Sequence, residues 1–337
     1  MDLDETTGTA APPGAEPAHG LAELFPTAYR QGRATTVPRI VVKPAPLPPP
    51  ASALVPEPED LDAALAPVLN VLAGRRLAAL TGAGVSTDSG IPDYRSPGSP
   101  VRQPMTFQQF CSSEAFRRHY WARNHLGWRH LRDAKPNAGH AALAALEARG
   151  LLTGLVTQNI DLLHVRAGSR AVVHLHGRYD RVKCLTCGAV IPREQHDADL
   201  VALNPGWRER HEHVADVEVA PDADVVLEST AGFRITDCAC GGVLIPDVVF
   251  FGSNTPRERV AAATAIVDDA AALLVAGSSL AVMSGLRFVR RAARAGHPVV
   301  ILNRGPTRGD DLATVKVDVG TSRALPYLAA RLPDLAP

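Results

Sequence analysis

Residues Thr81–Ser96 read TGAGVSTDSGIPDYRS and directly follow the apolar run Leu77–Leu80. This order predicts a buried strand that ends in a turn at Gly82 and Gly84, where glycine allows positive φ and close approach of a ligand to the backbone. Free N–H groups at such a turn, opening into a helix, suit a pyrophosphate. The spacing is G-A-G-x-S, and Ser89–Pro92 interrupts any helix, so a simple dehydrogenase fingerprint fits poorly. The stretch alone therefore leaves nucleotide binding and a plain tight turn as open alternatives.

Apolar runs alternate with amphipathic stretches along most of the chain. Strands that alternate with helices predict an α/β fold with a doubly wound, parallel, Rossmann-like sheet. The expected strands, besides the first, are Leu151–Thr157, Val172–Leu175, Ala272–Ala276, Pro298–Leu302 and Val315–Val319, with an extended run at Val248–Phe251. The expected helices are Leu61–Leu72, one or two within Phe107–Leu131, Ala141–Ala148 with Asn137 as its N-cap and Gly150 as its stop, Gly285–Ala295, and Leu325–Leu332.

Four polar motifs directly follow expected strands. They are Gly82–Gly84, Gln158–Asp161, Gly277–Ser279 and Asn303–Gly305. In parallel sheets of this kind, ligands bind beyond the carboxyl ends of the strands. We therefore expect these motifs, although they are far apart in the sequence, to form one binding site.

The composition divides the chain into three parts. Residues 1–58 are rich in proline and alanine, which predicts a disordered arm because such a segment buries little apolar surface. Cysteines, charges and turn residues gather in residues 178–245, which we expect to form a small inserted module. The remaining segments, 59–177 and 246–334, are expected to form one discontinuous nucleotide-binding domain.

Two pairs of cysteines in the expected module have the spacing of metal ligands. Cys184 and Cys187 form a C-x-x-C pair, and Cys238 and Cys240 form a C-x-C pair after 50 intervening residues. Four thiolates suit a closed, tetrahedral, structural Zn²⁺ site that stabilises a lobe with a small core. Redox-active or unligated thiols are the alternative, and a catalytic zinc is not expected because four sulfur ligands leave no open position.

Charge and hydropathy exclude other classes of protein. The 337 residues carry 35 basic and 35 acidic side chains, so we expect no nucleic-acid partner. The acidic N-terminus lacks an apolar leader, and the longest apolar stretch, Ala270–Leu286, is shorter than a membrane span. We expect a cytoplasmic protein, monomeric and without a membrane partner.

The motifs, taken in order, resemble those of the sirtuin family of NAD-dependent protein deacylases. The likeness covers the glycine loop and then Gln158–Asp161, His174–Gly177, Cys184–Cys187 and Pro246–Gly252, within a region from about Leu61 to Leu332. Connecting stretches resemble the class II branch: Tyr120–Asn124, Leu203–Pro205 and Gly305–Leu312. The bias towards arginine and alanine is typical of a GC-rich bacterial genome. One departure is the C-x-C pair, since C-x-x-C is usual in the family.

The resemblance implies a transferase that acts as a protein lysine deacetylase, or more broadly a deacylase. It passes the acyl group from lysine to ADP-ribose and releases nicotinamide from its co-substrate NAD⁺. His176 is the implied catalytic base, a role that suits histidine because its ordinary pKa lies near working pH. Asn159 and Asp161 are implied to position ribose and water. His174 is the competing histidine, at a position where family members commonly carry an acidic residue.

The resemblance also implies which residues bind the co-substrate and the acyl-lysine protein substrate. The NAD⁺ site would comprise Gly82, Ala83, Gly84, Ser86, Thr87, Asp93, Tyr94, Arg95, Gln158, Asn159, Ile160, Asp161, Gly277, Ser278, Ser279, Asn303, Arg304, Gly305 and Thr321. The substrate peptide would join Val249, Phe250, Phe251 and Gly252 as an added strand.

Two further activities stay open. Protein mono-ADP-ribosyl transfer is one alternative, and a preference for longer or acidic acyl groups is another. The second rests on Tyr120 and Arg123, which are spaced to share a helix face and resemble a pair that reads the acyl carboxylate in the desuccinylating branch. A solvated helix face explains the same pair.

Overall fold

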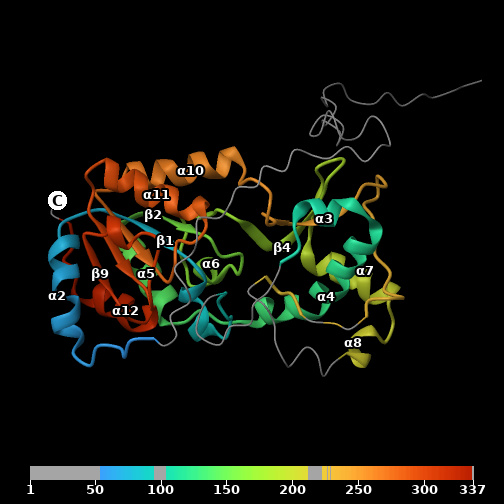
Figure 1. Ribbon diagram of the computed structural model, residues 1–337, viewed down its shortest axis with the longest axis horizontal. Coiled ribbons are helices and arrows are strands. Elements are labelled where there is room, and N and C mark those ends of the chain that lie inside the picture. The colour runs from blue at the N-terminus through green and yellow to red at the C-terminus, as the bar shows by residue number, and fades with distance from the viewer. Residues whose placement is uncertain (1–53, 95–103, 212–221, 226, 228, 336–337) are drawn as a thin grey trace, which may run out of the picture.

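The computed structural model describes residues 54–94, 104–211, 222–225, 227 and 229–335. It consists of a large α/β domain and a smaller lobe beside it (Figure 1). Most of the predicted N-terminal arm, together with Arg95, lies outside the described residues. Within the described part, no helix is both long and apolar enough to cross a membrane.

The large domain is built on a six-stranded sheet in the order β3-β2-β1-β7-β8-β9. The pairings are parallel throughout, which confirms the predicted doubly wound sheet. The strands are β1 Leu77–Thr81, β2 Leu152–Thr157, β3 Val172–His174, β7 Ala272–Ala276, β8 Val299–Leu302 and β9 Val315–Val317. The chain winds in opposite directions from β1, so that β1 and β7 enclose the topological switch point where such sheets bind ligands.

The register brings the ends of the central strands to one level. Thr81, the last residue of β1, pairs with Thr157 of β2 and with Ala276 of β7, and Ala276 pairs with Leu302 of β8. Each of these residues is the last of its strand. The four predicted polar motifs therefore all begin at the same edge of the sheet.

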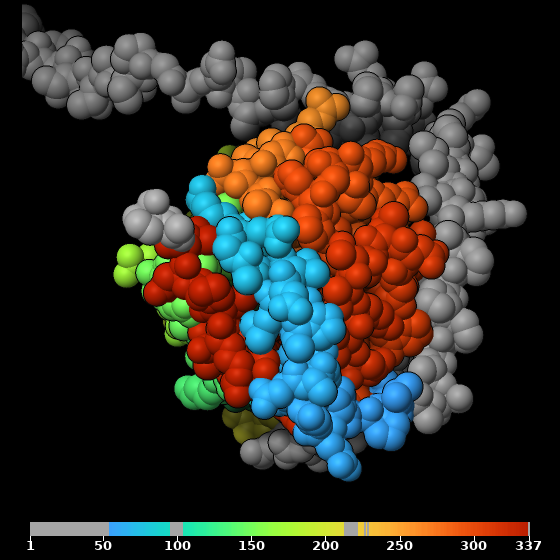
Figure 2. Space-filling model, turned by 90° about the vertical axis from the view of Figure 1, so that its left-hand side faces the viewer, coloured from blue at the N-terminus to red at the C-terminus, as the bar shows by residue number. Residues whose placement is uncertain are grey.

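Two helical layers cover the sheet because its strands present apolar residues to both faces. On one face, Ala79 and its neighbours pack against α2 Leu61–Leu72, α5 Ala138–Ala148 and α12 Thr321–Arg331. On the other face, Leu80 and its neighbours pack against α10 Arg257–Asp268 and α11 Met283–Arg294. Figure 2 shows the side of the large domain on which α2 lies beside α12. The helix α2 lies at the edge of the sheet, where it contacts β9.

Most predicted elements occur within two residues of their expected bounds. The N-cap at Asn137 is confirmed, since its side chain accepts hydrogen bonds from the N–H groups of Gly139 and His140. The C-terminal helix begins at Thr321, four residues before the expected start. The helix α10 was not predicted, although Pro256 precedes it as expected for a helix start.

The smaller lobe contains an antiparallel sheet in the order β5-β4-β6. Its strands are β4 Gly177–Cys184, β5 Val190–Pro192 and β6 Leu244–Val248, and its helices are α3 Phe107–Ser112, α4 Glu114–Asp133, α7 Arg193–Leu203 and α8 Trp207–Arg210. One apolar cluster joins Phe110 and Trp121 of the helices to Val182 and Ile245 of the sheet. The predicted domain boundaries stay a prediction, and this cluster places α3 and α4 with the smaller lobe.

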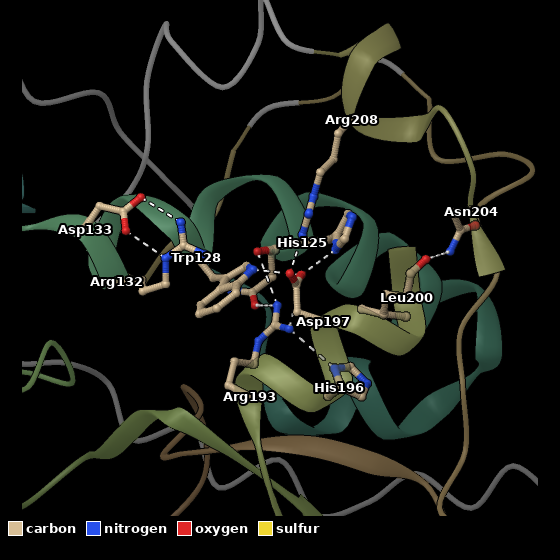
Figure 3. Close-up of polar contacts among 11 residues, drawn as sticks. His125, Trp128, Arg132, Asp133, Arg193, His196, Asp197, Leu200, Asn204 and Arg208 are labelled. Carbon is tan, nitrogen blue, oxygen red and sulfur yellow. Dashed lines mark hydrogen bonds and ion pairs between the residues drawn. The ribbon is translucent and has the colours of Figure 1, made fainter. Parts of the chain in front are cut away.

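A buried ionic cluster ties α4, α7 and α8 together (Figure 3). Asp197 accepts hydrogen bonds from Trp128 Nε1 at 2.8 Å and from Arg208, and His125 Nδ1 lies 2.7 Å away. Burial raises the pKa of the Asp197 carboxyl, but the hydrogen bonds from His125 and Arg208 outweigh it and bring the pKa below its ordinary value. Arg193, whose side chain is 1% exposed, lies over the rings of Trp121 and Trp128 and donates to Asn124. Because a buried charge is costly unless paired, this cluster has a structural role.

Candidate active site

The loops that follow β1 and β7 touch each other at the edge of the sheet. A Cβ added at Gly82 would lie 2.8 Å from the side chain of Ser278, and one at Gly84 would lie 3.0 Å from Gly277. Gly277 has φ +61°, and its Cβ would lie 2.4 Å from the nitrogen of Val85. Only glycine allows this crossing, so the motif is a packing requirement as well as a turn.

The glycine loop differs from its prediction in two ways. It forms two short 3₁₀ segments, Ala83–Val85 and Thr87–Ser89, in place of a regular helix. The N–H groups of Gly82 and Gly84 donate to the carbonyls of Ala276 and Gly277, and those of Val85 and Ser86 donate within the loop. The expectation of free N–H groups at the turn of Gly82 and Gly84 was therefore wrong, because carbonyls at the end of β7 and just after it already accept from both.

The Gln-Asn-Ile-Asp motif connects the loops of β1, β2 and β7. The Gln158 amide donates to Ser278 Oγ at 2.7 Å. The Asn159 amide donates to Gly82 O at 3.0 Å and to Ser86 Oγ at 3.1 Å. Ser86 in turn donates to Asp161 Oδ2 at 2.7 Å. These contacts form two hydrogen-bonded groups, Gln158 with Ser278 and Ser86 with Asn159 and Asp161, which join the ends of β1, β2 and β7.

Asp161 is the acidic side chain among these residues, and it is buried, with 3% exposure. Burial raises the pKa of Asp161. The hydrogen bonds from Ser86, from the Leu163 N–H and from Asn159 lower the pKa but do not cancel the effect of burial. His140 Nε2 lies 3.5 Å from Ser86 Oγ, on the side away from the sequence motifs. Sequence reasoning missed His140, since its position in α5 follows an ordinary amphipathic pattern.

His176 lies between β3 and β4, and both of its ring nitrogens have partners. Nδ1 is 2.9 Å from Gln158 O, and Nε2 is 2.7 Å from Ser284 Oγ in the first turn of α11. Burial lowers the pKa of His176 to about 4, so the imidazole is neutral at pH 7. The next residue must be glycine, because a Cβ at Gly177 would lie 2.0 Å from Asp247 O. Ser284 was not predicted, and no local pattern distinguishes it from other serines of its stretch.

His174 stands at the end of β3, paired with Thr157. Burial lowers its pKa to about 4 as well. The pKa therefore does not distinguish the two histidines. What distinguishes them is the contact of His176 Nε2 with Ser284 Oγ.

Further residues predicted for the NAD⁺ site follow β8 and begin α12. The Asn303 amide donates to the carbonyls of Arg304 and Gly305. Thr321 Oγ1 donates to Gly84 O at 3.3 Å, which links this region to the glycine loop. Arg304 forms an ion pair with Glu57 at 3.0 Å. The N-terminal segment before α2 therefore reaches this end of the site.

The remaining predicted residues lie around the same loops. Thr87 Oγ1 donates to Gly84 O, Ile160 O accepts from the Tyr179 N–H, and Ser279 O accepts from the Arg308 N–H. Asp93 and Tyr94 end the described part of the glycine stretch, and Ala83 opens its first 3₁₀ segment.

The predicted substrate segment is not a continuous strand. β6 ends at Val248, so only the first residue of the expected extended run Val248–Phe251 belongs to a strand, and Phe251 forms an isolated bridge. The Val249 N–H donates to His176 O, Phe250 is buried against Tyr120, and Phe251 is 46% exposed and bridges to Thr106. The chain leaves the sheet here because Phe251 pairs with the start of α3, and it then turns at Gly252 with φ +78°. Tyr94 stacks edge-on against Phe251, which joins the glycine stretch to this segment.

The side chain of Arg123 is engaged by the smaller lobe. It donates to Asp224 at 2.6 Å, to the carbonyl of Val225, and lies 2.8 Å from His119 Nε2. Tyr120, one turn earlier, packs instead against Phe250, with ring centroids 5.2 Å apart. The predicted pair therefore divides its contacts between an acidic partner and the aromatic segment next to His176.

The four predicted cysteines come together at the end of the small sheet. Sγ of Cys184 lies 3.6 Å from that of Cys240, and Sγ of Cys187 lies 3.7 Å from that of Cys238. All four sulfur atoms lie within 4.8 Å of one another. Zn–S bonds of about 2.3 Å in a tetrahedron require S···S separations of roughly 3.8 Å, so the group fits a structural zinc ion.

Comparison with known proteins gives consistent results. The model of the Sir2 family matches residues 82–284. An NAD-dependent protein deacetylase 1 of Mycobacterium avium is 59% identical over 266 residues, which cover 79% of this chain and 94% of the relative. A protein of the same description from Streptomyces coelicolor is 51% identical, over 80% of this chain and 90% of the relative. A solved structure described as Sir2–p53 peptide–NAD⁺ superimposes with a TM-score of 0.61 at 30% identity, over 79% of this chain and 97% of the other.

Proposed function

The chain belongs to the Sir2 family, and from this premise we propose that it is an NAD-dependent protein lysine deacetylase. The relatives that carry this description match nearly their whole length. NAD⁺ supplies the ribose to which the acyl group passes as nicotinamide leaves. Solved neighbours described with p53 and propionylated peptides support an acyl-lysine side chain as the other substrate.

The observation that carries the proposal is the position of His176 beside the loops of β1, β2 and β7. Gln158 connects these parts, because its carbonyl contacts His176 Nδ1 and its amide binds Ser278. A carbonyl oxygen only accepts hydrogen bonds, so Nδ1 carries the proton and Nε2 carries the lone pair. We assign His176 Nε2 as the proton acceptor of the reaction.

The hydrogen-bonded group next to His176 supplies positioning. Asn159 and Asp161 share Ser86 as a partner and are held within the wall of the site. We propose that they orient a ribose hydroxyl and a water molecule. The adenosine half would lie toward Asn303 and Thr321, and the four cysteines would hold a structural Zn²⁺ that fixes the start of the smaller lobe.

The first test compares two histidines that are two residues apart. Wild type, His176→Ala and His174→Ala are incubated with NAD⁺ and an acetyl-lysine peptide, and nicotinamide and peptide products are identified by mass spectrometry. We expect peptide-dependent deacetylation in the wild type and a loss of about 10²-fold or more in His176→Ala, since general-base catalysis contributes about 10²–10⁴-fold. His174→Ala should retain most activity.

Each other outcome contradicts a definite part of the proposal. Nicotinamide release without peptide, together with labelled protein, would identify mono-ADP-ribosyl transfer as the main activity. Equal losses in both histidine variants would remove the specific assignment of His176. Absence of release from folded wild-type protein with a range of acyl peptides would overturn the proposed function.

A further inference from the structure

Ser284 contacts the one nitrogen of His176 that can accept a proton. Because Gln158 O faces Nδ1 at 2.9 Å, the neutral ring carries its proton on Nδ1. The Ser284 hydroxyl, 2.7 Å from Nε2, must then donate to the lone pair of that nitrogen. The two contacts approach opposite sides of the ring. A ring flip would present carbon-bound hydrogens to both partners, so the contacts together fix the orientation of the imidazole.

The position of Ser284 is set by rigid parts of the fold. It is the second residue of α11 and is 8% exposed. The following residue is Gly285, where a Cβ would lie 2.6 Å from the Gln158 side-chain oxygen. This glycine lets the first turn of α11 pack directly against Gln158, the residue that also holds His176 Nδ1. One helix start and one loop therefore hold both sides of the ring.

The electrostatic surroundings keep the imidazole neutral, which is the form that accepts from a hydroxyl. Burial lowers the pKa of His176 to about 4, and the charge of Arg259 in α10 acts in the same direction. Arg259 is itself paired with Asp247 of β6 at 2.8 Å. The hydrogen bond from Ser284 is therefore the interaction present at neutral pH.

We propose that Ser284 is a positioning residue for His176, an inference that rests on the proposed function. Its hydroxyl keeps the ring in the orientation in which Nε2 faces the site, and it stays beside the ring and restrains it when a substrate hydroxyl replaces it as the donor to Nε2. The proton of the substrate hydroxyl then passes to Nε2, and the Ser284 proton stays on its own oxygen. Neither the family assignment nor the sequence motifs attribute a role to this serine.

The experiment compares Ser284→Ala with Ser284→Thr, which keeps a hydroxyl, and with Ser169→Ala as a control. Ser169 is also a buried serine, and its Oγ has no hydrogen-bond partner among the described residues. The first readout needs no NAD⁺: long-range ¹H–¹⁵N spectra of histidine-labelled protein, with His176 assigned by its absence in His176→Gln. We expect wild-type His176 to be protonated on Nδ1. In Ser284→Ala, and in neither of the other two variants, we expect the Nε2 resonance of His176 to move to the position of a nitrogen that accepts no hydrogen bond.

The second readout is steady-state deacetylation. One hydrogen bond of ordinary strength corresponds to roughly a tenfold change in rate. We therefore expect kcat to fall about tenfold in Ser284→Ala, with the KM for NAD⁺ changed less than about twofold, and to recover in Ser284→Thr. Ser169→Ala should match the wild type in both readouts.

Several results would overturn the proposal. A wild-type spectrum in which His176 is protonated on Nε2 would refute the proposed hydrogen bond from Ser284. This measurement needs no variant, so it tests the proposal even if Ser284→Ala does not fold. An unchanged Nε2 resonance in folded Ser284→Ala would also refute it, whatever the rate. Failure of the wild type to deacetylate would overturn the proposed function, whereas the spectra would still test the contact between Ser284 and His176.

Discussion

At the scale of single residues, we predict that Arg123 influences which acyl groups the site accepts. A guanidinium near the aromatic segment Phe250 and Phe251 would favour a carboxylate-bearing acyl group, but Asp224 already pairs with it at 2.6 Å. The pair is about one-fifth exposed on each side, so solvent weakens it only in part. A second carboxylate would have to displace the Asp224 side chain. From this contact we predict a preference for acetyl over acidic acyl groups.

The substitution Asp224→Asn tests this preference. Removing the negative charge leaves Arg123 available, because a hydrogen bond to a charged group is stronger than one to a neutral amide. We expect the ratio of succinyl-lysine to acetyl-lysine turnover to rise about tenfold. The measurement is competition between the two peptides under the same conditions.

A matched control is Asp199→Asn, which removes an exposed carboxylate from α7 in the same lobe. It should leave the ratio unchanged. An unaltered ratio in Asp224→Asn would show that Arg123 does not face the acyl group, and the acetyl preference would then have another cause.

At the scale of elements, the two short cysteine turns depend on a glycine between β4 and β6. The second turn is tight, since the Gly241 N–H donates to Cys238 O and the Cys238 N–H to Gly242 O. Gly242 lies against the first turn, and a Cβ there would lie 2.6 Å from Cys184 Sγ. The C-x-C spacing is thus accommodated because Gly242 brings the second pair close to the first.

Gly242→Ala is expected to disrupt the proposed zinc site. The added methyl group would push Cys184 Sγ out of the tetrahedron, and structural zinc contributes directly to folding free energy. Zinc content should fall well below one ion per chain, and the thermal transition should occur at a lower temperature. Metal analysis and calorimetry on the same preparations measure both effects.

Gly188→Ala provides the comparison, because Gly188 lies at the other cysteine turn. It has a φ of +74°, and a Cβ there would meet nothing within 4 Å. It should cost about 1 kcal/mol from backbone strain and retain its zinc. If both variants bind one zinc ion equally well, the contact at Gly242 has no bearing on the metal.

At the scale of the whole molecule, segments about 250 residues apart meet beside the region proposed for the adenosine half of NAD⁺. Glu57 bridges Arg304 at 3.0 Å and Arg323 at 2.8 Å, and the carbonyls of Val55 and Pro58 accept hydrogen bonds from the same two arginines. The last residues of the predicted N-terminal arm are therefore packed against the start of α12.

The substitution Glu57→Gln should release this segment. It weakens two partly exposed ion pairs, each worth about 0–1 kcal/mol. We expect faster amide hydrogen exchange in residues 54–60, while the central strands keep their protection. Glu59→Gln, an exposed neighbour, should leave exchange unchanged. Equal exchange in both variants would show that the main-chain contacts alone hold the segment.

The sequence by itself determined the sheet, most of the helices that cover it and the grouping of polar motifs. Strands such as Ala272–Ala276 can be recognised from a short stretch of sequence, because burial on both faces of the sheet requires a continuous run of hydrophobic residues. The strand ends then follow, and with them the positions of Gly82, Gln158 and Asn303. The cysteine pairs were equally legible, because a zinc site requires particular ligands at short spacing.

Only the tertiary structure decided which groups those residues contact. Ser284 reaches His176 across 108 positions of the sequence, Asp224 reaches Arg123 across 101, and Gly277 binds the N–H of Gly84 that seemed free for a ligand. The chain also leaves β6 at Val248 because Phe251 pairs with the start of α3. Local patterns encode periodicity and turns, whereas hydrogen-bond partners between distant segments depend on how closely helices and loops pack.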